Sequence, residues 1–98
     1  MPRGYWIASV DVTDPEGYKE YVSANAAAFR KYGARFLVRG GRFEVPEGTA
    51  RSRNVVLEFK DYETALACYN SPEYAAAKAL RLGRSEANLI IIEGYDAP

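Results

Sequence analysis

The 98-residue sequence contains no histidine, and this absence excludes several kinds of chemistry. A His-ligated haem or zinc, and the Ser-His-Asp and Cys-His catalytic groups, all need an imidazole. Acid–base catalysis would therefore fall to carboxylates or tyrosines. We expect no metal and no cofactor.

Cysteine is almost absent too, because Cys68 is the only one. A single thiol cannot form an internal disulfide or a multi-thiolate metal site, which favours a reducing compartment. We therefore expect the protein in the cytoplasm. With no partner for nucleophilic chemistry, Cys68 is interpreted as a small buried hydrophobe.

Long apolar runs and an excess of one charge are also lacking. No run approaches the ~20 apolar residues of a membrane span, and the amino terminus lacks a secretory signal pattern, so we expect no membrane association. Thirteen Lys and Arg balance thirteen Asp and Glu, which argues against nucleic-acid binding. The length supports one core, and hence one domain over residues 1–98.

The residues that are present begin with a two-faced strand. Residues 5–12 alternate with period two, which is typical of a β-strand. Trp6, Ala8, Val10 and Val12 share one face, and Tyr5, Ile7, Ser9 and Asp11 share the other.

A helix is predicted from Pro15 to about Tyr32. Asp14 is placed to cap its amino end, and Gly33 to cap its carboxyl end in a left-handed conformation. Its apolar stripe consists of Tyr18, Val22, Asn25, Phe29 and Tyr32. Asn25 is the polar exception in this stripe.

Two further strands are expected, over residues 34–45 and 53–60, joined by a turn at 46–49. The aromatics change parity across Gly40-Gly41, which favours one long bent strand with a β-bulge at the glycines. A tight Gly-Gly hairpin is the alternative.

Asp61 can cap a short helix, and Ser71 with Pro72 starts a second helical segment that ends near Leu82. We expect that segment to bury Ala75, Ala76, Ala79 and Leu82, and to expose Tyr74, Lys78 and Arg81. The last strand, 88–94, is apolar on both faces and is predicted to lie centrally in the sheet.

The order βαββαβ predicts an α+β, ferredoxin-like fold, with an antiparallel sheet that carries its helices on one face. Three strands nevertheless place large hydrophobic side chains on both faces, and helices cover only one. The second face therefore needs a partner. We predict a symmetric homodimer, sheet against sheet.

Several segments, in this order, resemble the bacterial family of domains of unknown function numbered 1330 (DUF1330). The resemblance spans nearly the whole chain. It rests on Gly4-Tyr5-Trp6-Ile7-Ala8, Phe36-Leu37-Val38-Arg39-Gly40-Gly41, Asn54-Val55-Val56-Leu57-Glu58-Phe59, Tyr69-Asn70-Ser71-Pro72-Glu73-Tyr74 and Ile92-Glu93-Gly94.

The resemblance implies a dimeric α/β barrel built from ferredoxin-like halves, and it assigns no activity. The wider superfamily of such barrels includes cofactor-free oxygenases, haem-degrading enzymes and small-molecule isomerases, often with a pocket between sheet and helices. This is an analogy at the level of the fold. The missing histidine argues against the haem-degrading branch.

Six residues are candidates for ligand binding. Asn25 needs a ligand, a backbone carbonyl or a buried water to satisfy its carboxamide. Arg39, beside two glycines, could hold a carboxylate or enolate, or pair with Glu58. The other candidates are Tyr18, Tyr69, Ser71 and Tyr74.

The tyrosines can line a small-molecule pocket or form ordinary core, and Ser71 can meet an anion at a helix amino end or act only as a cap. Glu93, Glu58 and Asp11 are weaker candidates for a general base. Three hypotheses follow: a homodimer that binds a small, partly apolar, anionic metabolite; a cofactor-independent oxygenase or isomerase; and a structural or interaction dimer.

Overall fold

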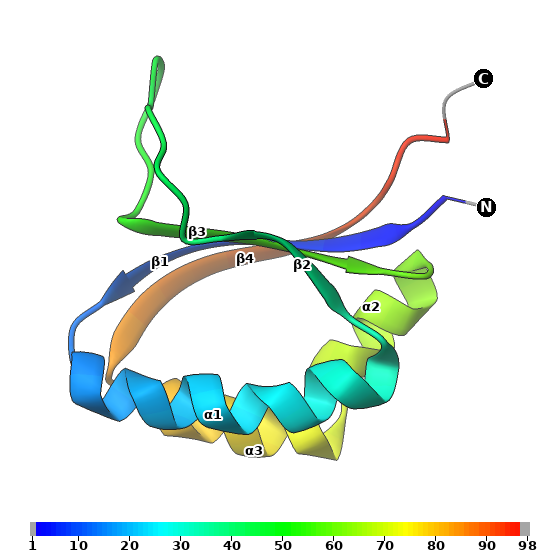
Figure 1. Ribbon diagram of the computed structural model, residues 1–98, viewed down its shortest axis with the longest axis horizontal. Coiled ribbons are helices and arrows are strands. Elements are labelled where there is room, and N and C mark those ends of the chain that lie inside the picture. Colours follow the sequence, from blue (N-terminus) through cyan, green and yellow to red (C-terminus); the bar gives the residue numbers. More distant parts are fainter. Residues whose placement is uncertain (1, 97–98) are drawn as a thin grey trace.

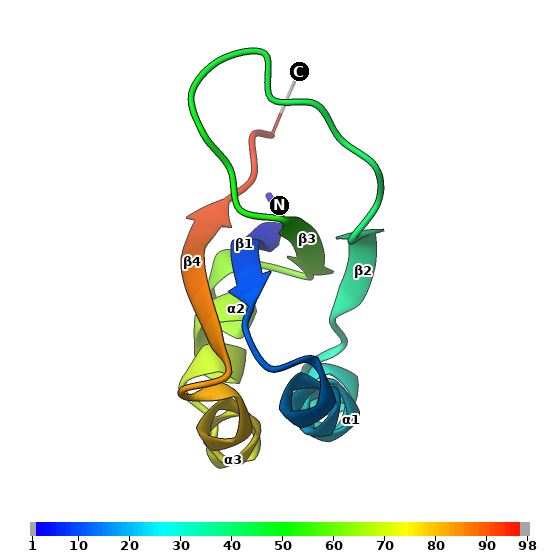
Figure 2. The same ribbon diagram turned by 90° about the vertical axis from the view of Figure 1, so that its left-hand side faces the viewer.

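The computed structural model describes residues 2–96 and has two layers, a four-stranded antiparallel sheet and three helices on one of its faces (Figures 1 and 2). This confirms the predicted ferredoxin-like α+β fold. None of the described helices is long and apolar enough to cross a membrane. The elements are β1 (Gly4–Val12), α1 (Pro15–Tyr32), β2 (Arg35–Arg39), β3 (Arg53–Phe59), α2 (Tyr62–Tyr69), α3 (Pro72–Arg81) and β4 (Ser85–Glu93).

The helix ends lie where the capping residues place them. The backbone N–H of Gly17 donates to Asp14 Oδ1 at 3.2 Å, and Gly33 ends α1 with a φ of 68°. Asp61 accepts from the N–H of Thr64 at 2.7 Å and so caps α2. These hydrogen bonds satisfy donors that a helix end leaves open, so short sequence signals set the boundaries.

The core is centred on Trp6 in β1, whose side chain is buried. Its indole Nε1 donates to the carbonyl of Ala65 in α2 at 2.9 Å. Four aromatic rings lie with centroids 4.9–5.8 Å from the indole, and they belong to Phe29, Phe59, Tyr69 and Tyr74. These contacts hold the helical layer against the sheet.

The strand order is β2-β3-β1-β4, so β1 and β3 are central and β4 is an edge strand. The prediction of a central last strand was therefore wrong. Leu89 and Ile91 of β4 pack against the core, whereas Ile90 and Ile92 are exposed on the other face. The apolar residues on both faces of β4 therefore do not indicate a central strand. They arise because the second face of the sheet is itself apolar and is not covered by the helices.

The predicted bulge at Gly40-Gly41 and its alternative, a tight hairpin, were both wrong. The register between β2 and β3 shifts between Phe36 and Val38, so Leu37 is the extra residue that changes the parity. β2 then ends at Arg39, and Gly40 turns the chain with a φ of 70°. Residues 40–52 form an arm that leaves the sheet on the side opposite the helices (Figure 1).

The predicted buried face of α3 was also wrong. Tyr74 and Ala77 are buried, whereas the side chains expected inside are exposed: Ala75, Ala76, Ala79 and Leu82. The large ring of Tyr74 removes far more apolar area from water than an alanine methyl does, and its hydroxyl finds a partner inside. The alanines therefore face solvent.

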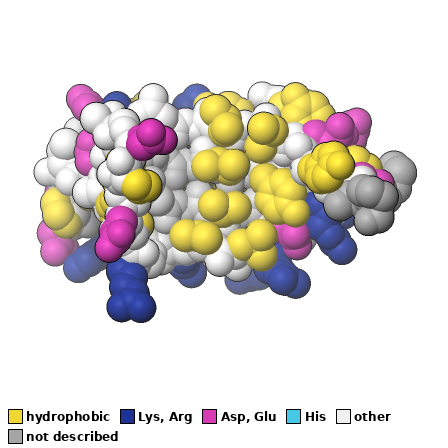
Figure 3. All heavy atoms as spheres, turned by 90° about the horizontal axis from the view of Figure 1, so that it is seen from above, with side chains coloured by type: hydrophobic (Ala, Val, Ile, Leu, Met, Phe, Trp, Pro, Cys, Tyr) yellow, Lys and Arg dark blue, Asp and Glu magenta, His cyan; other side chains and the backbone are white. Residues whose placement is uncertain are grey.

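The face of the sheet opposite the helices carries an apolar row across all four strands. The register places Val38, Val56, Ile7 and Ile90 side by side. Paired positions point to the same face, and Figure 3 shows hydrophobic side chains gathered over the middle of that face. Ile7 is 42% exposed and Ile90 is 54% exposed.

Candidate functional site

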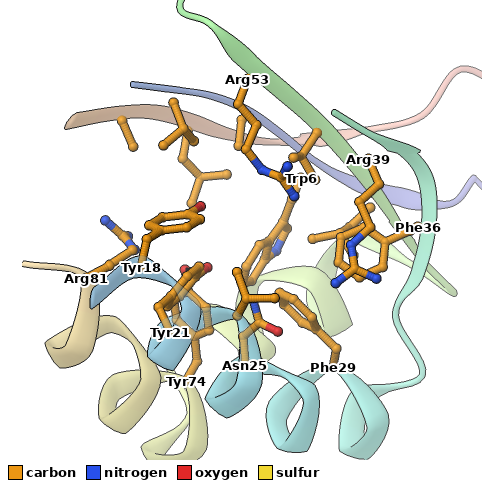
Figure 4. A pocket seen from close by; sticks show the side chains of 17 residues that line it. Trp6, Tyr18, Tyr21, Asn25, Phe29, Phe36, Arg39, Arg53, Tyr74 and Arg81 are labelled. Carbon is orange, nitrogen blue, oxygen red and sulfur yellow. Dashed lines mark hydrogen bonds between the residues drawn. The ribbon is translucent and has the colours of Figure 1, made fainter. Parts of the chain in front are cut away.

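A cavity of about 50 Å³ lies between the sheet and the helices α1 and α3 (Figure 4). Its walls are largely apolar and include Trp6, Phe29 and Leu57. Polar groups reach it from several elements: Tyr18, Tyr21, Asn25, Arg39, Arg53, Tyr74 and Arg81. Apolar walls with a few converging polar groups are typical of small-molecule sites.

Three arginines supply the charge of the cavity. Arg39 ends β2, Arg53 begins β3 and Arg81 ends α3, so three separate segments bring guanidinium groups to one space. No aspartate or glutamate is among the lining residues, and none of the three arginines forms an ion pair with a carboxylate of residues 2–96. The cavity is therefore positively charged.

The guanidinium groups differ in their contacts. Arg53 Nε is buried and has no hydrogen-bond partner within the described chain. Arg39 Cζ lies 4.3 Å from the centre of the Phe36 ring, and Arg81 Cζ lies 5.6 Å from the centre of the Tyr21 ring. Burial acts to lower the pKa of Arg81, but the interactions with Tyr74, Tyr21 and Tyr69 together outweigh burial and raise it, so this side chain stays charged.

Tyr18 lies on α1 at the boundary of the cavity, facing Arg53 and Arg81. Burial raises the pKa of its hydroxyl, and the positive charges of Arg53 and Arg81 oppose that rise without cancelling it. The hydroxyl is therefore protonated near neutral pH and can donate a hydrogen bond to an anion.

Asn25 and two tyrosines form the polar floor. Asn25 is 6% exposed, in the middle of α1, and its carboxamide lines the cavity. The hydroxyl oxygens of Tyr21 and Tyr74 lie 2.8 Å apart. Burial, reinforced by Tyr74, raises the pKa of Tyr21, and hydrogen bonding with Asn25 lowers it by less. The floor is thus uncharged.

Four of the six predicted site residues meet at this cavity, namely Tyr18, Asn25, Arg39 and Tyr74. Tyr69 and Ser71 lie outside its lining. Ser71 Oγ accepts from the N–H of Tyr74 at 3.1 Å and donates to the carbonyl of Cys68 at 2.7 Å, so it acts as the cap of α3. The Tyr69 hydroxyl accepts from Lys78 Nζ at 2.7 Å.

The acidic candidates also lie away from the cavity lining. Glu58 accepts from the Tyr5 hydroxyl at 3.1 Å and lies 4.0 Å from Arg3 Nε, so it does not pair with Arg39. Asp11 accepts from Ser52 N–H and Arg51, which lower the pKa of its carboxyl. Glu93 is exposed at the end of β4.

The single cysteine lies in the core. Cys68 is fully buried, and burial raises the pKa of its thiol to about 12. The reactive thiolate is therefore scarce at neutral pH. In the described part of the chain, no cluster of three or more acidic or cysteine residues is placed to hold a metal ion.

Sequence reasoning missed Arg53 and misplaced Arg81. Arg53 has the same parity as Val55, Leu57 and Phe59, so the alternation of β3 already placed it on the inner face. Arg81 is half-buried and lines the cavity, whereas the sequence prediction left it exposed. That error followed from assigning the alanines of α3 to the core.

Fold and cavity together define a ferredoxin-like α+β protein with a cationic space between its two layers. The model of the family described as "Domain of unknown function (DUF1330)" matches residues 3–95, and the chain belongs to that family. The predicted family is therefore confirmed. No curated protein matches the sequence.

Solved structures show the same fold at low identity. A protein of unknown function from Rhodopseudomonas palustris is 14% identical, with a TM-score of 0.78 over 98% of this chain and 85% of that chain. A dimeric ferredoxin-like protein of unknown function from Thermobifida fusca is 15% identical, with a TM-score of 0.63 over 94% and 91%. SnoaB, a cofactor-independent oxygenase from Streptomyces nogalater, is 11% identical, with a TM-score of 0.64 over 99% and 97%.

Proposed function

We propose that the protein binds a small, partly apolar, anionic molecule in the cavity between sheet and helices. One observation carries this function: three guanidinium groups face the cavity, and no carboxylate among its lining residues balances them. Arg39 is exposed and Arg53 and Arg81 are partly buried, but the Nε of Arg53 is held away from water without a hydrogen-bond partner, which is unfavourable. An anionic ligand supplies both the charge and the acceptors.

The residues have distinct roles in this proposal. A guanidinium group can donate two parallel hydrogen bonds to a carboxylate, and the unpartnered Nε of Arg53 is a donor that the ligand would satisfy. Tyr18 and Asn25 add neutral donors. The apolar walls, including Phe29 and Leu57, contact the part of the ligand next to its anionic group.

Fluorescence of Trp6 provides the direct test, because it is the only tryptophan and it lines the cavity. We expect butanoate to change its emission saturably and the uncharged isostere butanamide to have no such effect. Arg53→Met should weaken butanoate binding at least tenfold, because the variant loses one charge-assisted hydrogen bond to the ligand. Lys60→Met, at an exposed lysine outside the cavity lining, is the matched control.

Two results would count against this function. One is equal binding of butanoate and butanamide, which would show that charge is not recognised. The other is unchanged binding by a folded Arg53→Met variant, with near-ultraviolet circular dichroism as the check on folding. A protein that binds no anion at all would leave the interaction dimer as the better hypothesis.

We also propose that the protein is a homodimer formed through the uncovered sheet face, which is the predicted dimeric α/β barrel. The exposed row that contains Ile7 and Ile90 supports this assembly, because burying such a row between two copies removes it from water. The Thermobifida fusca protein of similar fold is described as dimeric.

A cytoplasmic location remains our expectation from the single cysteine.

A cofactor-independent oxygenase or isomerase is the second candidate function. It is favoured by the same arginines, which would stabilise an enolate or phenolate formed from a bound substrate. SnoaB, a cofactor-independent oxygenase, shares the fold. Dioxygen consumption or exchange of substrate protons with a panel of phenolic and enolisable compounds would support this candidate, and inertness toward the panel would refute it.

A further inference from the structure

We propose that the ligand is elongated, with its anionic group in the cavity and an apolar tail in a groove along α1. This inference rests on the proposed function and specifies the chemical class of the ligand. The ligand would be an amphiphilic carboxylate whose tail is longer than the cavity can hold.

The size of the cavity is the first observation. Ligand pockets in proteins usually measure about 300–1,000 Å³. The cavity measures about 50 Å³, which is room for a carboxylate group or a few waters. A ligand bound only inside it would be no larger than its own head group, so any further part of the molecule must leave the cavity.

A second space adjoins the cavity and has the missing size. This shallow groove beside α1 is largely open to solvent and has a volume of about 720 Å³. Tyr18, Val22 and Arg53 line both spaces, so the cavity and the groove meet at these three side chains. The groove is therefore the neighbouring space into which the rest of a ligand in the cavity would extend.

The residues that line the groove indicate that the tail of the ligand is apolar. Val12, Pro15, Val22 and Ala26 give it an apolar wall. Lys19, an exposed cation that lines the groove, already lies 3.3 Å from Glu16 Oε1, so it is partly neutralised. The cations without carboxylate partners lie at the inner end instead, where Arg53 joins Arg39 and Arg81. The arginines inside the cavity therefore match the anionic group of the ligand, and the apolar wall of the groove matches its tail.

A homologous series of carboxylates tests this arrangement. Octanoate extends butanoate by four methylenes, and each methylene that is fully buried strengthens binding about fourfold. The groove is open on one side, so we expect octanoate to bind at least tenfold more tightly than butanoate. Trp6 emission measures both, since neither probe absorbs near the tryptophan band.

Two neighbouring alanines on α1 provide a matched pair of variants. Ala26 and Ala27 are both exposed, but only Ala26 lines the groove. Ala26→Trp should weaken octanoate binding at least tenfold and butanoate binding by less, because butanoate places fewer methylenes in the groove. Ala27→Trp should change neither, because it projects from another side of the helix. Each added tryptophan needs its own baseline, so dialysis with labelled octanoate is measured in parallel.

The outcomes separate this inference from the function on which it rests. If octanoate and butanoate bind to the parent protein equally well, the elongated ligand is overturned and the anion site stands. The same holds if Ala26→Trp and Ala27→Trp behave alike. If neither carboxylate binds the parent protein, the proposed function itself fails. The comparison of the two probes on the parent protein requires no variant to fold.

Discussion

The hydroxyl oxygens of Tyr21 and Tyr74 lie 2.8 Å apart inside the protein, and this hydrogen bond joins α1 to α3. Both side chains are buried, at 8% and 2% exposure. Asn25 also hydrogen-bonds with Tyr21, and Arg81 with Tyr74, so the pair belongs to a larger polar cluster. The pair also forms part of the cavity floor, so it links the packing of the helices to the candidate site.

The first prediction concerns this pair. Tyr21→Phe or Tyr74→Phe alone should lower the free energy of unfolding by about 1–2 kcal/mol, because the remaining buried hydroxyl loses a partner. The double variant should lose less than the sum of the two single losses. Urea denaturation of the four proteins measures the coupling. Strictly additive losses would show that the two hydroxyls do not interact.

The second prediction concerns alkaline pH. The pKa values of Tyr18 and Tyr21 are raised above the ordinary 10.0, chiefly by burial. At these two groups the folded protein holds protons that the unfolded chain releases, so their contribution to stability is fully present below about pH 10 and is lost as the pH rises further.

Urea midpoints measured between about pH 8 and pH 11.5 test this sign. Tyr21→Phe should show a shallower alkaline decline than the parent protein, because it lacks the group whose pKa is raised most strongly. Other groups that titrate above pH 10 are common to both proteins and do not alter the comparison. Parallel declines in the two proteins would refute the assignment to Tyr21.

The third prediction concerns the assembly. Ile7→Lys places a charge in the middle of the exposed row on the sheet, next to Val56 and Ile90. Two such charges facing each other across a two-fold interface would oppose association. We expect the parent protein to have about twice the 10.9 kDa chain mass and the variant to have the chain mass itself.

Sedimentation or native mass spectrometry measures both masses. Leu82→Lys is the control, because Leu82 is a more exposed hydrophobic residue, at 63%, and lies at the end of α3 away from the sheet row. This control should remain dimeric. A monomeric parent protein, or a dimeric Ile7→Lys variant, would contradict the proposed interface.

The fourth prediction concerns the close approach of β1 to α2. A Cβ on Gly4 would meet the carbonyl oxygen of Asp61, and would lie 2.6 Å from the Asp61 carbonyl carbon and 2.7 Å from Tyr62 Cα. These are backbone atoms and cannot rotate away. Gly4→Ala should therefore lower the free energy of unfolding by about 1–3 kcal/mol.

Gly41→Ala is its matched control. A Cβ at Gly41 would meet no described atom within 4 Å, and its φ is not positive. We expect a change within about 0.5 kcal/mol. Thermal or urea unfolding of the two variants decides the prediction, and an equal effect of both substitutions would contradict it.

Local sequence signals determined the elements of this protein. Asp14 and Gly33 mark the ends of α1, and Asp61 and Ser71 start α2 and α3, because a cap depends on hydrogen bonds within a few residues. The alternation of residues in β1 likewise predicted which side chains lie on each face of the sheet, because successive side chains of a strand point to opposite faces. Together with the element order, these signals predict the ferredoxin-like fold.

The candidate site was only partly predictable. Asn25 was found because a carboxamide in an apolar stripe is conspicuous in the sequence alone. Arg39 was found beside its glycines, although the bulge expected there lies at Leu37. Arg53 was predictable from the parity of β3, but a charged residue at the end of an apolar strand is common and gave no reason to assign it to a site.

The tertiary structure alone decided which distant groups meet. The inward position of Tyr74 on α3 brings its hydroxyl to 2.8 Å from that of Tyr21, which lies in another helix. Arg39, Arg53 and Arg81 converge because β2 and α3 end, and β3 begins, at the same cavity, a relation that no spacing along the chain encodes. The sequence determined the elements through contacts between neighbouring residues, and packing between the layers determined the site.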